Sequence, residues 1–86
     1  MENLPQFDKE ILLDIVRKRM PFGKYKGTII ADLPISYLEW FMRKGGFPEN
    51  KLGSWMATTY EIKSNGLQEI IYKLKQIVPQ DNKPYS

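Results

Sequence analysis

The residues from Gly23 to Thr28 are the part of this sequence whose types and spacing come nearest to a chemical site. They read Gly-Lys-Tyr-Lys-Gly-Thr, and a glycine-bounded basic loop invites comparison with the P-loop that holds nucleotide phosphates. A P-loop needs four residues between its glycines and a lysine directly after the second one. Here the spacing is one residue short and a threonine follows, so the loop is not a P-loop. What remains is basic charge interleaved with an aromatic ring, the pairing that holds a phosphate backbone and stacks a base.

Two interpretations of this basic loop stay open. In the first, Lys24 and Lys26 contact phosphates and Tyr25 stacks on a base. In an extended chain, however, the two lysines would project to one side and Tyr25 to the other, because side chains alternate along a strand. In the second interpretation Tyr25 folds inward and the lysines only keep the loop soluble. The sequence alone does not decide between these interpretations.

The surroundings of the loop are strongly basic. Between Asp14 and Asp32 the sequence has no acid, and five cations fall there, so the rest of the chain carries −2 of the net +3. Apart from the two loop lysines these cations are Arg17, Lys18 and Arg19. A local basic patch is the footprint expected for an anionic partner such as nucleic acid. The alternative is that the triplet only complements the dipole at the end of a helix.

Catalysis lacks its usual groups. The chain has no histidine and no cysteine, so no imidazole base can activate Ser36 or Ser64 and no thiolate can bind metal. The acids near the recognisable motifs are Asp32, Glu39 and Glu61, and they are scattered singly rather than paired for a metal ion. We therefore expect no enzyme activity, no catalytic residue, no metal and no cofactor.

Length and composition indicate one small domain. Eighty-six residues hold a single core, and eleven aromatic residues supply apolar area to it. We expect a domain over residues 1–79 and a disordered polar tail over residues 80–86. The first residues do not resemble a signal peptide, and no apolar run is long enough to span a membrane. We expect a cytoplasmic protein that does not bind membranes, and a homodimer is possible.

The pattern of apolar residues predicts an α+β fold in which a two-stranded hairpin packs on four helices, in the order α-β-β-α-α-α. Asp8 caps a first helix that ends before Pro21, and residues 20–30 form the hairpin. Ser36 and Glu39 form a capping box for a second helix. The third helix begins near Asn50 and the fourth spans about residues 67–78. The third ends at the glycine signal Asn65-Gly66.

The helical stripes also predict a core and one close contact. We expect six large residues in one core, namely Trp40, Phe41, Trp55, Tyr60, Ile70 and Leu74. Gly53 interrupts the stripe of the third helix, which indicates close approach of another backbone.

Between residues 20 and 67 the sequence resembles a known family. The matching segments are Met20-Pro21-Phe22-Gly23-Lys24-Tyr25-Lys26-Gly27, Leu33-Pro34, Tyr37-Leu38-Glu39-Trp40-Phe41, Gly46-Phe47-Pro48, Lys51-Leu52-Gly53 and Tyr60-Glu61-Ile62-Lys63-Ser64-Asn65-Gly66-Leu67. The family is that of small bacterial proteins labelled "putative quorum-sensing-regulated virulence factor", a domain of unknown function. A similar segment is found in the C-terminal domain of exodeoxyribonuclease X-like proteins. The resemblance implies an accessory domain that works near nucleic acid, without the carboxylates of the exonuclease part.

Two functions therefore remain. The first is a nucleic-acid-binding module for single strands, in which Lys24, Tyr25 and Lys26 bind and the basic triplet 17–19 forms a rim. Its partner would be nucleic acid or a nucleic-acid-processing protein. The second is a protein-interaction adaptor with an aromatic groove near Trp40, Phe41 and Phe47.

Overall fold

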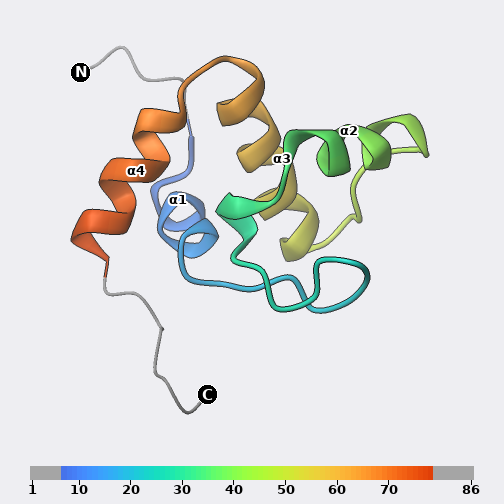
Figure 1. Ribbon diagram of the computed structural model, residues 1–86, viewed down its shortest axis with the longest axis horizontal. Coiled ribbons are helices and arrows are strands. Elements are labelled where there is room, and N and C mark those ends of the chain that lie inside the picture. The colour runs from blue at the N-terminus through green and yellow to red at the C-terminus, as the bar shows by residue number, and fades with distance from the viewer. Residues whose placement is uncertain (1–6, 79–86) are drawn as a thin grey trace.

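The computed structural model describes residues 7–78 and places them in four α-helices and one short 3-10 helix. The helices are α1 (Lys9–Ile15), η1 (Ile30–Asp32, the 3-10 helix), α2 (Ile35–Arg43), α3 (Lys51–Ser64) and α4 (Gln68–Ile77). In Figure 1, α2 and α4 lie toward opposite ends of the long axis, with α3 between them. α3 packs against α1, α2, η1 and α4, so it is the central element of the domain.

The predicted hairpin is wrong, and with it the α+β fold class, because residues 7–78 contain no strand. Arg19 and Ile29 form one isolated antiparallel bridge. The ladder cannot extend, because the groups that would continue it are already bonded within neighbouring helical turns. The Lys18 N–H donates to the Asp14 carbonyl at the end of α1, and the Ile30 carbonyl accepts the Leu33 N–H in η1. The fold is therefore all-α.

The helix ends predicted from Asp8, Asn50 and Gly66 are confirmed. The Asp8 carboxylate accepts the Glu10 N–H at 2.8 Å, and the Asn50 side-chain oxygen accepts the Gly53 N–H at 3.1 Å. At the end of α3, Gly66 has a φ of 71°, in the left-handed region that glycine tolerates. These bonds satisfy backbone groups that a helix end otherwise leaves unpaired.

The predicted capping box of α2 is wrong. The helix begins at Ile35, one residue before Ser36, and its N-cap is Pro34. The fixed φ of proline, here −63°, suits a helix entry, and the Pro34 carbonyl accepts the Tyr37 and Leu38 N–H groups. The Ser36 hydroxyl is thus not needed as a cap.

The core lies where α1, η1 and the first turns of α2 meet α3. Its fully buried side chains include Ile15, Met20, Ile30, Leu33, Leu38, Met56 and Ile62. Of the six residues predicted for the core, five are partly buried against it: Phe41, Trp55, Tyr60, Ile70 and Leu74. The prediction that Trp40 lies in the core is wrong, because 47% of its surface is exposed.

Buried polar contacts fix the position of α3. The Trp55 indole N–H donates to the Asp14 carboxylate at 3.2 Å, across the contact between α1 and α3. Asp14 is buried. The predicted close approach at Gly53 is confirmed, since a Cβ there would lie 1.6 Å from the Pro48 carbonyl oxygen. Only glycine lets the 47–49 turn pass this close to α3.

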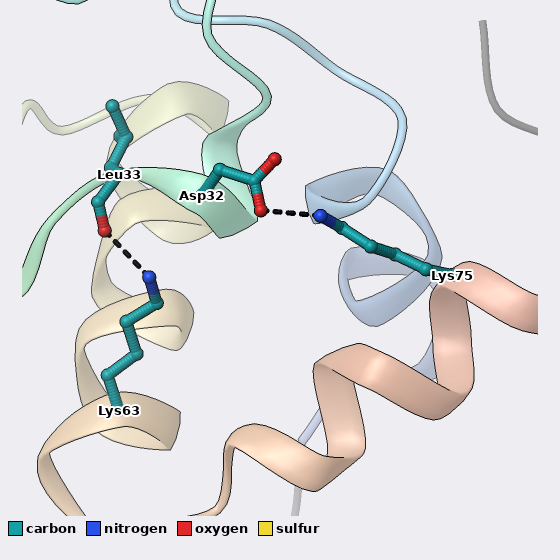
Figure 2. A network of polar contacts seen from close by, with 4 residues as sticks. All are labelled: Asp32, Leu33, Lys63 and Lys75. Carbon is teal, nitrogen blue, oxygen red and sulfur yellow. Dashed lines mark hydrogen bonds and ion pairs between the residues drawn. The ribbon is translucent and has the colours of Figure 1, made fainter.

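Two lysines hold η1 to the helices that flank it (Figure 2). Lys75 of α4 forms an ion pair with Asp32, at 2.5 Å, and Lys63 of α3 donates to the Leu33 carbonyl at 2.8 Å. Burial lowers the pKa of the Lys63 ammonium, with the Asp32 carboxylate opposing this shift and the Lys75 cation adding to it. The Leu33 carbonyl accepts a hydrogen bond from Lys63, and this bond offsets part of the free-energy cost of burying the charged ammonium group.

Two expectations concern the ends of the chain. The tail over residues 80–86 and the first six residues, which bear on the signal-peptide question, lie outside the described residues. Within residues 7–78 no helix is long and apolar enough to cross a membrane.

Candidate functional site

A groove of about 680 Å³ opens between the 21–28 loop and α2. This volume falls within the range of roughly 300–1,000 Å³ typical of ligand pockets. Its lining consists of Phe22, Gly23, Lys24, Tyr25, Ser36, Tyr37, Trp40 and Phe41. The loop and the helix thus each contribute one wall, and most of the lining is aromatic. We call it the aromatic groove.

The loop wall is built from turns instead of strands. The Lys26 N–H donates to the Gly23 carbonyl, and the Thr28 N–H donates to the Tyr25 carbonyl. Gly23 has a φ of 81° and also lies close to α2, since a Cβ there would be 3.2 Å from the Tyr37 hydroxyl. The absence of a side chain at position 23 therefore lets the loop reach the helix.

Arg19 closes the loop at its base. Its guanidinium Nη1 donates to the Gly27 carbonyl at 2.8 Å, and the Gly27 N–H donates in turn to the Met20 carbonyl. Arg19 was predicted to form part of a rim that contacts phosphates. Its guanidinium instead binds the protein's own backbone, so in this structure it acts on the shape of the loop.

The helix wall is an aromatic stack that begins in the loop. The ring centroids of Tyr25 and Tyr37 are 4.7 Å apart, and those of Tyr37 and Phe41 are 5.3 Å apart, both in edge-to-face arrangements. Trp40 packs edge-to-face on Phe41 at 5.3 Å, and Phe47 continues the stack toward α3 at 6.1 Å from Phe41. Contacts of this geometry contribute beyond simple area burial, so the walls are held in fixed relative positions.

Two ammonium groups lie over rings of this stack. The Lys24 Nζ is 5.5 Å from the centroid of the Tyr25 ring, and the Lys44 Nζ is 5.6 Å from the centroid of the Trp40 ring. Both distances fall within the reach of a cation–π interaction, about 6 Å. Each pair joins a cation to an aromatic surface at the groove or directly beside it.

The Tyr37 phenol stays protonated over a wider pH range than an ordinary tyrosine. Burial raises its pKa above 10.0, and the neighbouring Tyr25 phenol raises it further, because two phenolates would repel each other. The hydroxyl faces the loop at Gly23. The groove therefore contains a neutral polar group at neutral pH.

The predicted site residues separate into three groups. Lys24 and Tyr25 line the aromatic groove together, as the interpretation of a binding loop requires. Lys26 is exposed in the same loop but is not among the lining residues. Arg17 and Lys18 are exposed just past the end of α1. Whether any of these residues binds a partner stays a prediction.

Phe22 and Ser36 were missed as groove residues. Trp40 and Phe41, which the adaptor interpretation placed near an aromatic groove, line this groove, whereas Phe47 is not among its lining residues. For the exposure of Trp40 the sequence did contain a signal. The apolar residues of α2, from Ile35 to Met42, cover an arc of about 220° at about 100° per residue. One core-facing stripe cannot bury so wide an arc. Trp40 lies at one edge of the arc and Met42 near the other, and both are 47% exposed. Phe22, also 47% exposed, carries no comparable signal because it lies in a loop.

The described residues offer no metal centre. Within residues 7–78 no three histidine, cysteine, aspartate or glutamate side chains gather closely enough to hold a metal ion. Ser36 lines the groove, and the chain has no histidine to serve as its base. The groove thus presents aromatic rings, the Lys24 ammonium group and the hydroxyl groups of serine and tyrosine.

Fold and groove together define a small all-α domain with an aromatic groove on its surface. Its sequence relatives make the assignment more specific. The model of the family described as "Putative quorum-sensing-regulated virulence factor" matches residues 8–74, and the chain belongs to this family. The match covers both walls of the groove.

The chain is similar to curated proteins of Escherichia coli. It is 49% identical over 69 residues to "Uncharacterized protein YpeB" of strain K12. The aligned residues cover 80% of this chain and 96% of the relative. YpeB of E. coli O157:H7 matches with the same figures. No solved structure matches the chain. The printed descriptions name a family and a context, and neither states a molecular activity.

Proposed function

We propose that this chain is a non-catalytic accessory domain that binds single-stranded nucleic acid in the aromatic groove. The observation that carries the proposal is the exposure of two large rings, Phe22 and Trp40, on opposite walls of one groove. Bases of a single strand stack on such rings without regard to sequence, because every base has a π face. In a duplex the bases are already stacked on one another and do not offer these faces.

Charge complementarity favours an anionic occupant. Among the eight described residues that line the groove, Lys24 is the single charged one and none is acidic. Lys26 in the same loop, with Arg43 and Lys44 at the end of α2, adds exposed cations nearby. Glu39 on α2 is the nearby acid in the sequence, and it is half-buried. A phosphate backbone that follows the groove would meet a net positive rim.

The resemblance of residues 20–67 to the C-terminal domain of exodeoxyribonuclease X-like proteins supports an accessory role. In such proteins the metal-binding carboxylates belong to the exonuclease part. A domain of this kind would deliver or retain a strand for a separate enzyme in the cytoplasm. The partner is then nucleic acid together with a nucleic-acid-processing protein.

A salt titration tests the proposal. The affinity for single-stranded DNA and RNA, measured by fluorescence anisotropy, should fall linearly with salt on log–log axes, and duplexes should bind more weakly. The doubly substituted Lys24→Gln, Lys26→Gln protein should show a slope reduced by about 1.4, at roughly 0.7 per phosphate contact. Lys73→Gln, an exposed change on α4, is the matched control and should leave the slope unchanged.

The contrary result would be tight binding without salt dependence, or no binding to any strand.

A protein-interaction adaptor is the second candidate, and one observation favours it. Trp40, at one edge of the α2 arc, and Met42, near the other edge, each leave 47% of their surface exposed. The apolar side chains of a partner peptide would pack on this exposed area, and such a contact needs no phosphate group. Peptide-type binding would weaken on Trp40→Ala and stay unchanged when the two loop lysines become glutamine.

A further inference from the structure

Two pairs of an aromatic ring and an ammonium group lie at the groove, and each wall contributes one of the two rings. Lys24 lines the groove, and Lys44 lies beside it on the ring of Trp40. On the loop wall the Lys24 ammonium lies 5.5 Å from the Tyr25 ring centroid. On the helix wall the Lys44 ammonium lies 5.6 Å from the Trp40 ring centroid. A nucleotide offers the complementary pair, a flat base linked to an anionic phosphate. Each ring-and-ammonium pair therefore has the chemistry to bind one nucleotide.

In the free protein each lysine occupies the ring face that a base would use. A base can stack there only if the ammonium moves aside, and the phosphate attached to that base provides a new partner for it. The exchange replaces a cation–π contact at an exposed site with a charge-assisted contact to phosphate. Both lysines are exposed and long enough to make this movement.

The two pairs are fixed relative to each other by the rings between them. Tyr25 contacts Tyr37, Tyr37 contacts Phe41, and Phe41 contacts Trp40, with centroid distances of 4.7, 5.3 and 5.3 Å. Gly23 adds the close approach of the loop to Tyr37. A ligand that contacts both pairs at once binds more tightly when their spacing is already fixed, because the protein then loses less conformational freedom on binding.

We infer that the groove binds two consecutive nucleotides of one strand, with one base on Tyr25 and the next on Trp40. Lys24 and Lys44 each leave their ring to pair with the phosphate beside the base that displaces them. This inference rests on the proposed function and adds to it the length of the ligand and the role of Lys44. The unit recognised is a dinucleotide step with unstacked bases.

A length series tests the inference. Thymidine 5′-monophosphate, the dinucleotide pTpT and longer oligothymidylates are titrated into the full chain at low salt, with calorimetry and quenching of Trp40 fluorescence as readouts. The second base should tighten binding at least about fivefold, the lower bound for one stacked base. Each further nucleotide should add less than this step. The Trp40→Phe protein identifies the part of the quenching that comes from Trp40.

Lys44→Gln separates the two pairs. With two independent mononucleotide sites, loss of one should weaken binding of the monophosphate by no more than about twofold, whereas pTpT, which loses the cation for one of its two phosphates, should lose clearly more than twofold. Lys24→Gln should give the same pattern, and Lys73→Gln should change neither ligand. Thermal melting by circular dichroism checks that each variant is folded.

The outcomes distinguish the two levels of the proposal. If oligothymidylates bind but pTpT binds no better than the monophosphate, or if Lys44→Gln affects both ligands equally, the two-nucleotide inference is overturned and the proposed function stands. If no member of the series binds, the proposed function fails, and the inference that rests on it fails as well.

Discussion

The guanidinium of Arg19 and the carbonyl of Gly27 are joined by a 2.8 Å hydrogen bond that closes the loop at the aromatic groove. Arg19 also forms the isolated bridge with Ile29, so its backbone and its side chain both fix the base of this loop. Backbone bonds hold the loop as well, since the Met20 N–H donates to the Thr28 carbonyl and the Gly27 N–H to the Met20 carbonyl. The Arg19 guanidinium adds a side-chain bond to these, so we expect it to contribute to the shape of this wall of the groove.

Arg19→Met should therefore loosen the loop, while Arg17→Met, its matched control two residues earlier, should not. Methionine retains the aliphatic stem and removes the donor. We expect a loss of about 1 kcal/mol in the free energy of unfolding, as for a typical hydrogen bond, measured by urea denaturation. Hydrogen exchange of the Met20 and Gly27 amides should accelerate, because both donate within the closed loop. Unchanged exchange at both amides would show that the clamp is not needed.

Gly53→Ala should strongly destabilise the fold. The new Cβ would lie 1.6 Å from the Pro48 carbonyl oxygen, and 2.7 Å from its carbon, so backbone must move. We expect a loss of about 3 kcal/mol in the free energy of unfolding, the upper range for overpacking. Ser54→Ala, an exposed change one residue later in α3, should lie within about 0.5 kcal/mol of the wild type. Equal melting temperatures for both variants would contradict the contact.

The features that sequence predicted correctly are local ones. Asp8 and Asn50 bond their own helix ends, and the gap in the α3 stripe at Gly53 marks a backbone contact. Such features depend on residues a few positions apart. The prediction of a hairpin over residues 20–30 was wrong because several partners compete for the same backbone hydrogen-bonding groups. The Ile30 carbonyl is bonded in η1 and the Thr28 N–H in a turn to Tyr25, while the facing Lys18 N–H is bonded at the end of α1. Propensity cannot show which of these partners a backbone group takes.

The candidate site was predicted in part for a related reason. Lys24 and Tyr25 were identified from their composition and line the groove. On the opposite wall, Trp40 and Phe41 were assigned to the core and also placed near the groove of the adaptor interpretation, so the sequence did not decide whether they face the core or the solvent. Hydrophobicity does not say which edge of a wide apolar arc stays in solvent, and Trp40 lies at that edge.

Tyr37 should make the protein sensitive to alkaline pH. Its folded-state pKa is raised above 10.0 by burial and by Tyr25, so the folded chain keeps this proton longer than the unfolded chain does. The associated stability is present below pH 10.0, the ordinary value, and is lost as pH rises through the folded-state pKa. The free energy of unfolding should therefore fall more steeply above that pH in the wild type than in Tyr37→Phe.

Urea denaturation of both proteins across the alkaline range measures this difference directly. Lys63 contributes a slope of the opposite sign, because its pKa is lowered from 10.5 and the unfolded chain binds its proton more tightly. That contribution is common to the wild type and Tyr37→Phe, so it cancels in the comparison. Parallel curves for the two proteins would show that the Tyr37 phenol ionises equally well in the folded and unfolded chains.

Trp40→Ala and Tyr25→Ala should separate binding from folding. Trp40 is 47% exposed, so its removal should cost little stability while weakening single-strand binding by about 1–3 kcal/mol, the loss of one stacked base. Tyr25 is half-buried and its ring lies 4.7 Å from that of Tyr37, so Tyr25→Ala should reduce both stability and binding. Neither change should alter the salt slope by as much as a lysine substitution, because neither removes a charge. Urea denaturation and anisotropy titrations on the same preparations measure both quantities. If Trp40→Ala unfolds the domain while its binding per folded molecule is unchanged, Trp40 is scaffold and the groove has no stacking platform on α2.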